Sequence, residues 1–110
     1  MITDKFIDNY IELYKKQCAY YSVKTRMIIN HEDVVALNAD HIQQKEKVSE
    51  MTQLIQAEWW GLSKEQAMKI NRLWIKAQNS GFWNDEVYCT YEKYLFDTYN
   101  NGNDYRIYFD

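Results

Sequence analysis

The chain has 110 residues, a formal net charge of −3, 46% hydrophobic residues, three glycines, two cysteines and no proline. The hydrophobic content excludes an intrinsically disordered chain, and the low glycine and cysteine counts exclude collagen-like and disulfide-rich proteins. A chain of this length buries about two-thirds of its unfolded surface on folding. We therefore expect a single compact α-helical domain over residues 1–110.

The first predicted element is a long helix over residues 3–28. Thr3 is its expected N-cap, and Asp4 is favourable in the first turn. Residues 21–29 also alternate in polarity as a strand would, and we prefer the helix because more residues match the helical spacing. The predicted apolar stripe of this helix consists of Ile7, Ile11, Tyr14, Cys18, Tyr21, Thr25 and Ile28.

A second long helix is predicted over residues 31–60, with Asn30 as its N-cap and Gly61 as the left-handed residue that ends it. Because only one or two residues join the two long helices, we expect an antiparallel hairpin. The predicted stripe has two polar members and consists of Val34, Leu37, His41, Gln44, Val48, Met51 and Ile55.

Two shorter helices are predicted to follow. Ser63 and Gln66 match a capping box, so a third helix begins there and ends at residues 79–81. Residues 84–86 cap a fourth helix over residues 85–99, and residues 105–109 alternate as a short strand would. The predicted fold class is mainly α. We expect about four helices in a small bundle, the first two long and antiparallel, with a short C-terminal extended segment or strand.

Charge alternates along the chain. The net charge is +2 over residues 1–30, −4 over residues 31–60, +3 over residues 61–81 and −4 over residues 82–110. Such runs usually mark solvated helix faces, and the alternative is that an acidic face docks on a basic partner. Lys69, Arg72 and Lys76 form a basic stripe on the third predicted helix, which favours a nucleic-acid-binding regulator as a competing hypothesis. The negative net charge makes direct binding to nucleic acid unfavourable.

Four Trp and ten Tyr exceed what one small core needs. Some of these rings fill the core, and others are expected to form a contact patch, because Trp and Tyr dominate binding hot spots. A third interpretation is an aromatic pocket that stacks a nucleotide base. The predicted partner-binding residues are Glu58, Trp59, Trp60, Trp83, Asp85, Glu86, Tyr88, Tyr91 and Glu92.

No residue pattern predicts catalysis, a metal or a cofactor. His31 and His41 lie ten residues apart, so they cannot chelate a metal as an i, i+4 pair would, and we expect His41 to be a hydrogen-bonded interface residue. Cys18 and Cys89 lack a Cys-x-x-Cys spacing and are expected to stay reduced. No serine lies in a nucleophile elbow, and three isolated glycines cannot form a phosphate loop. We therefore expect a protein that is not an enzyme and uses no cofactor.

The N-terminal residues predict neither a secretory signal nor a membrane span, because charges interrupt the sequence throughout. The residue usage is typical of AT-rich genes, which are common in phages. We expect a small, acidic, cytoplasmic protein that binds and sterically inhibits a protein or nucleoprotein target, as phage anti-CRISPR inhibitors and toxin-immunity proteins do. The alternatives are the nucleic-acid-binding regulator and an oligomer that sequesters a nucleotide. The two long apolar stripes also allow a homodimer.

Overall fold

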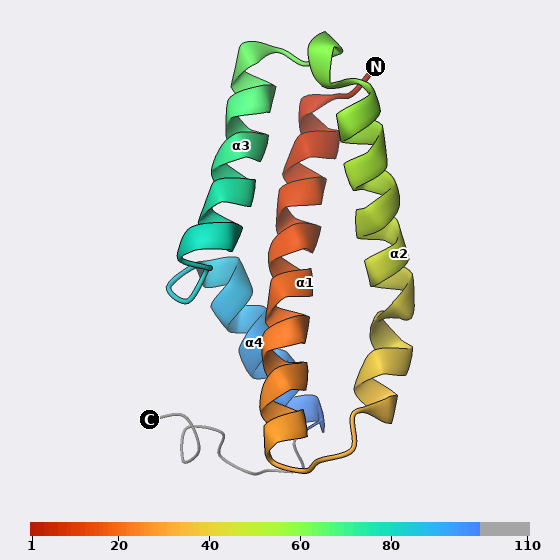
Figure 1. The fold of residues 1–110 in the computed structure, drawn as a ribbon, viewed down its shortest axis with the longest axis vertical. Coiled ribbons are helices and arrows are strands. Elements are labelled where there is room, and N and C mark those ends of the chain that lie inside the picture. Colours follow the sequence, from red (N-terminus) through yellow and green to blue (C-terminus); the bar gives the residue numbers. More distant parts are fainter. Residues whose placement is uncertain (100–110) are drawn as a thin grey trace.

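The computed structural model describes residues 1–99, which form four α-helices and one 3-10 turn. Helix α1 lies between α2 and α3, and α4 crosses behind the C-terminal half of α1 (Figure 1). The mainly α fold and the antiparallel arrangement of the first two helices are confirmed (Figure 1). The predicted extended segment over residues 105–109 lies outside the described residues. The elements are α1 (Asp4–Ile29), α2 (Val35–Ala57), η1 (Trp59–Gly61), α3 (Lys64–Asn79) and α4 (Glu86–Tyr99).

Helix α1 begins where the sequence predicts. The Oγ1 atom of Thr3 accepts a hydrogen bond from the backbone N–H of Phe6 at 3.1 Å, and Asp4 adds a carboxylate to the first turn. Residues 21–29 continue this helix, so the helical interpretation of that segment is confirmed and the strand interpretation is wrong.

The buried face of α1 changes along its length. The predicted stripe describes the N-terminal half, where Ile7 is buried, but it is wrong in the C-terminal half, where Tyr21 and Ile28 are exposed. The face shifts because the N-terminal half packs against α3 and the C-terminal half packs against α4 (Figure 1). In the C-terminal half the buried residues are Ala19, Tyr20, Val23 and Met27.

The connection between α1 and α2 is longer than the sequence predicts. Asn30 ends α1 instead of capping α2, and His31 has a positive φ of 60°. The N–H groups of His31 and Glu32 donate to carbonyl groups in the last turn of α1, which is the hydrogen-bond pattern of a Schellman motif. Helix α2 begins only at Val35, whose N–H donates to Oδ1 of Asp33 at 2.9 Å.

The predicted stripe of α2 is confirmed, whereas its predicted end is wrong. Its core members are buried, and Val34 and Gln44 are half-buried. The helix ends at Ala57, and the next residues form the 3-10 turn. Gly61 therefore does not cap α2. Within residues 1–99, the glycine with a positive φ is Gly81, at 71°, which follows α3.

Two clusters of buried side chains hold the bundle together. The first core joins the N-terminal half of α1, the C-terminal half of α2, and α3, whereas the second core joins the remaining halves of α1 and α2 to α4. Helices α1 and α2 therefore contribute to both cores. The first core consists of Ile2, Ile7, Tyr10, Val48, Met51, Ile55, Ile70, Leu73 and Phe82. The second core consists of Tyr20, Val23, Met27, Leu37, Leu95 and Phe96.

A chain of hydrogen bonds crosses the first core. The indole N–H of Trp74 donates to the hydroxyl of the buried Tyr10 at 3.0 Å. The hydroxyl of Thr52 donates to the carbonyl of Val48 at 2.8 Å, so the Tyr10 hydroxyl is the donor in its 2.8 Å bond to Thr52. The chain links α3, α1 and α2, and it satisfies the polar atoms that this core buries.

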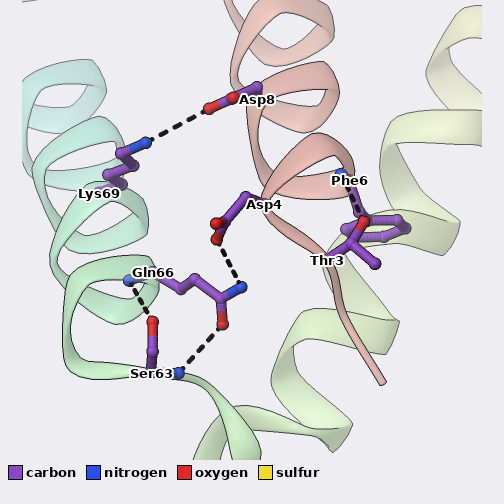
Figure 2. Close-up of polar contacts among 7 residues, drawn as sticks. All are labelled: Thr3, Asp4, Phe6, Asp8, Ser63, Gln66 and Lys69. Atoms are coloured by element: carbon purple, nitrogen blue, oxygen red, sulfur yellow. Dashed lines mark hydrogen bonds and ion pairs between the residues drawn. The ribbon is translucent and has the colours of Figure 1, made fainter.

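The N-terminal ends of α1 and α3 are joined by polar contacts (Figure 2). The predicted capping box is confirmed, because Ser63 and Gln66 exchange side-chain to backbone hydrogen bonds of 3.0 and 3.1 Å. The Gln66 Nε2 atom also donates to Oδ1 of Asp4 at 2.9 Å, and the Nζ atom of Lys69 lies 3.5 Å from Oδ1 of Asp8 (Figure 2). The amide of Gln66 therefore both caps α3 and holds it against α1.

Candidate interaction surfaces

The residues predicted to bind a partner lie in three parts of the molecule. Residues 58–60 lie at the end of α2 and in η1, residues 83–85 lie in the connection between α3 and α4, and residues 86–92 lie within α4. Helix α3 separates the first two groups, and its 16 residues correspond to a length of about 24 Å. The predicted residues therefore do not form one continuous patch.

The four tryptophans divide into two that pack inside and two that face solvent. Trp59 stacks on Trp74 with ring centroids 5.8 Å apart, and both rings pack against the first core. Trp60 is 96% exposed and Trp83 is 73% exposed. Trp59 thus belongs to the edge of the core, whereas Trp60 and Trp83 present large apolar rings to solvent.

Glu92 is used inside the molecule, which corrects its assignment to an exposed acidic face. Its side chain is on the face of α4 that packs on α1, and the residue as a whole is only 8% exposed. Its Oε2 atom accepts a hydrogen bond from the hydroxyl of Ser22 at 3.0 Å and lies 3.3 Å from Nη1 of Arg26. Because a buried carboxylate requires such partners, Glu92 contributes to the packing of α4 on α1.

Asp85 is also engaged by residues of this chain. Its Oδ1 atom accepts a hydrogen bond from the N–H of Tyr88 at 3.1 Å, in the first turn of α4. Its Oδ2 atom lies 2.8 Å from Nζ of Lys15. Burial acts to raise the pKa of Asp85, but the hydrogen bonds from Lys15 and the helix N–H groups outweigh it and lower the pKa. Asp85 therefore joins the start of α4 to α1.

Tyr88 and Tyr91 are half-buried where α4 packs on α1 and α2. Burial raises the pKa of each phenol to about 12, and the nearby carboxylate of Glu92 adds to the effect at Tyr88. The hydroxyl of Tyr91 lies 2.5 Å from Nε2 of His41 and 3.2 Å from Oε1 of Gln44. These residues contribute mainly to the interior, and only part of each ring is available to a partner.

His41 is a hydrogen-bonded residue of the α1–α2–α4 interface, as its place in the stripe predicts. It is buried, and its Nδ1 atom donates to the carbonyl of Leu37 at 3.0 Å. Its ring stacks on Tyr20 with centroids 5.0 Å apart. The imidazole therefore joins the second core through both nitrogens and one face.

An open groove of about 480 Å³ lies between α1 and α4. It brings together two of the predicted residues, Glu86 and Tyr91. Tyr94 stacks on Tyr91 with ring centroids 5.8 Å apart, and Nζ of Lys16 lies 5.4 Å from the Tyr91 centroid. The sequence analysis missed Tyr94, although it lies three residues after Tyr91 and thus on the same helix face. The groove is lined by Glu12, Lys16, Glu86, Val87, Thr90, Tyr91 and Tyr94.

A second groove, of about 300 Å³, lies between α1 and α3. It contains all three residues of the predicted basic stripe, and α1 adds Lys15 to them. The Nζ atoms of Lys15 and Lys76 lie 5.9 and 5.8 Å from the ring centroid of Phe82. The lining residues are Asp8, Ile11, Lys15, Lys69, Arg72, Leu73, Lys76, Phe82 and Asp85.

Within residues 1–99, no group of three or more His, Cys, Asp or Glu side chains is arranged to hold a metal ion. The described helices include none that combines the length and apolar character needed to span a membrane. No protein-family model, curated protein sequence or solved structure matches the chain. Function therefore has to be inferred from the surfaces of this chain.

Proposed function

We propose that the protein binds a protein or nucleoprotein target in the cytoplasm and blocks it sterically, as phage anti-CRISPR inhibitors and toxin-immunity proteins do. The observation that carries this proposal is the exposure of two tryptophan rings, Trp60 at 96% and Trp83 at 73%. Neither ring belongs to either core. A tryptophan that becomes buried at the centre of an interface typically contributes about 2 kcal/mol or more to binding. The free thiols of Cys18 and Cys89 are compatible with a reducing compartment.

We assign the main contact surface to the α1–α4 groove and to Trp83, which precedes the groove residues Glu86 and Val87 in the chain. The stacked rings of Tyr91 and Tyr94 supply apolar area, and Tyr94 is 56% exposed. Glu86 and Lys16 add charges to the lining of the same groove, and the Lys16 ammonium lies over the Tyr91 ring. Aromatic rings surrounded by charged groups are the usual composition of a protein interface.

The test is capture of the target by the tagged protein from a nuclease-treated lysate of its natural host. We expect one stoichiometric protein or complex, and we expect the double variant Trp83→Ala/Tyr94→Ala to lower its affinity at least about tenfold. Both side chains are exposed, so the helical circular dichroism and the thermal midpoint should stay unchanged. The comparison variant is Trp60→Ala, which removes the exposed ring at the opposite end of α3 and tests whether that ring belongs to the contact surface.

Two results would contradict the proposal. Recovery of the tagged protein alone, or only with copies of itself, would contradict the existence of a separate target. If the Trp83→Ala/Tyr94→Ala variant still binds the target fully, the α1–α4 groove is not the contact surface. If Trp60→Ala loses the target in the same experiment, the contact surface lies at η1 instead.

The charge of Glu86 provides a kinetic test of the same surface. Glu86→Lys is expected to slow association with a basic target several-fold, because charges at the edge of an interface act mainly on the association rate. Glu50→Lys, which makes the same charge change at an exposed position of α2, is the control. Surface plasmon resonance at two salt concentrations measures the association rate of each variant. Equal association rates for Glu86→Lys and Glu50→Lys would exclude a role for Glu86.

A further inference from the structure

The groove between α1 and α3 is a positive region on an acidic protein. Four cations and two carboxylates line it, which leaves two positive charges in the groove. The whole chain carries −3, so the remainder of the protein carries −5. A concave site lined by one sign of charge concentrates ligands of the opposite sign. The cations are Lys15, Lys69, Arg72 and Lys76, and the carboxylates are Asp8 and Asp85.

Two of the four cations are held in place by carboxylates. Lys15 pairs with Asp85 at 2.8 Å, and Lys69 pairs with Asp8 at 3.5 Å. Within residues 1–99, Arg72 and Lys76 have no carboxylate partner, and they lie one turn apart on the groove side of α3. Their head groups are therefore available to a ligand.

We propose that this groove binds a small phosphate monoester. Its two uncompensated positive charges match the charge of about −1.5 to −2 that such a group carries at neutral pH, whereas a carboxylate would supply only −1. The guanidinium of Arg72 suits bidentate contact with phosphate oxygens, and the ammonium groups of Lys15 and Lys76 supply point charges beside it. A volume of about 300 Å³ is at the small end of ligand sites, which fits a metabolite and not a polymer.

The lining of the groove favours an organic ester over a polynucleotide. Ile11, Leu73 and Phe82 give the groove an apolar part that the carbon skeleton of a small ester can contact. A nucleic-acid duplex carries one charge per about 1.7 Å, so its neighbouring phosphates would meet the carboxylates and the acidic remainder of the surface. This site shares no residue with the α1–α4 groove, so the inference is independent of the proposed target binding.

Titration of the full chain by calorimetry tests the proposal with ribose 5-phosphate, adenosine monophosphate and inorganic phosphate. We expect both esters to bind saturably, inorganic phosphate to bind more weakly, and ribose and adenosine not to bind. Tight binding of the nucleotide alone would identify a nucleotide as the source of the phosphate. If neither ester binds saturably up to about 10 mM, or if adenosine binds as well as its monophosphate, the proposal is overturned.

A pair of matched variants separates the site from general charge attraction. Arg72→Gln/Lys76→Gln should weaken ester binding at least about tenfold, because it removes charge-assisted hydrogen bonds. Lys5→Gln/Lys93→Gln removes the same charge at exposed positions outside the groove and should leave the affinity unchanged. Equal weakening in both variants would overturn the proposal. Tighter binding of a single-stranded oligonucleotide than of adenosine monophosphate, lost in the first variant, would also overturn it and assign the groove to nucleic acid.

Discussion

His31 occupies a backbone conformation that glycine adopts at lower cost. Its φ of 60° lies in the left-handed region, where the Cβ atom costs roughly 1 kcal/mol. His31→Gly is therefore expected to raise the free energy of unfolding by about 0.5–1 kcal/mol, because the Schellman turn after α1 keeps its hydrogen bonds. Urea denaturation with an unchanged m-value would measure this gain.

Gly81 provides the opposite substitution. It has a φ of 71°, and a Cβ atom there would meet open space, so Gly81→Ala changes only the backbone preference. We expect a loss of about 1 kcal/mol. A loss in both His31→Gly and Gly81→Ala would show that the imidazole of His31 stabilises the turn by more than its backbone strain costs.

Residue-scale features were predictable where the deciding atoms lie within one turn. The Thr3 cap and the Ser63–Gln66 capping box depend on spacings of three residues, which a sequence displays directly. The left-handed residue could not be assigned to His31 in this way, because its position depends on where α1 ends. That end is fixed by packing of the C-terminal half of α1 in the second core.

At the scale of elements, the link between α1 and α3 requires an amide at residue 66. A glutamate could still accept the hydrogen bond from Ser63, but it could not donate to Asp4 and would place a second carboxylate beside it. Gln66→Glu is expected to lower the free energy of unfolding by about 1 kcal/mol at pH 7, and by less at a pH where the carboxylates are protonated.

The control for this prediction is Asp4→Asn/Gln66→Glu, which removes the neighbouring charge and keeps the acceptor of the capping box. Thermal unfolding at neutral and acidic pH compares the variants. Equal stability of Gln66→Glu and the wild-type chain would show that the capping box alone accounts for the role of Gln66.

The hydrogen-bond chain of the first core yields a second prediction for elements. Tyr10→Phe leaves the half-buried indole N–H of Trp74 without its acceptor and is expected to destabilise the protein by about 1 kcal/mol. Tyr14→Phe removes a half-buried hydroxyl without a hydrogen-bond partner within residues 1–99, so it should have little effect. Chemical denaturation measures the free energy of unfolding of both variants. Equal losses would exclude a specific role for the hydrogen-bond chain.

The prediction of the buried face succeeded for α2 and failed for half of α1, for one physical reason. Leu37, Val48 and Ile55 face α1 along the whole helix, so a single periodic stripe describes them. Helix α1 packs against α3 in its N-terminal half and against α4 in its C-terminal half. In the C-terminal half the buried residues are therefore Tyr20, Val23 and Met27, and the predicted Tyr21 and Ile28 are exposed. Periodicity locates a buried face only as long as the partner stays the same.

For the whole molecule, the half-buried phenols of Tyr88 and Tyr91 predict instability at alkaline pH. Tyr88 and Tyr91 have pKa values of about 12 in the folded state, above the ordinary value of 10.0. Their contribution to stability is complete below pH 10 and is lost as the pH rises through 12, because the unfolded chain releases these protons first. We expect loss of helical circular dichroism between pH 10 and 12, together with a rise in tyrosinate absorbance.

Tyr91→Phe tests the assignment. It removes one of the phenols with a raised pKa, so stability should fall less steeply with pH in this range, although the variant also loses the polar contacts of this hydroxyl with His41 and Gln44. Ionisation of all tyrosines near pH 10 with the helices intact would contradict the prediction.

The candidate surfaces could be predicted only in part, because each groove combines distant segments. Lys69, Arg72 and Lys76 share one helix face, so their clustering was visible in the sequence. Lys15 and Lys16 lie next to each other in α1, yet Lys15 faces the groove with α3 and Lys16 faces the groove with α4. The burial of Glu92 depends on Ser22 and Arg26, about 70 residues away. No local pattern reports such pairs.

The division into two cores determines what spectroscopy can report about unfolding. Trp59 and Trp74 pack against the first core, Trp60 lies in η1, and Trp83 lies in the α3–α4 connection. The second core contains Tyr20, and Tyr91 and Tyr99 pack against it. Indole fluorescence therefore monitors the part of the bundle that contains α3, whereas circular dichroism monitors all helices. If α4 separates from α1 before the first core opens, the dichroism will decrease while the indole emission stays constant, so coincidence of the two signals is a direct measure of cooperativity between the halves.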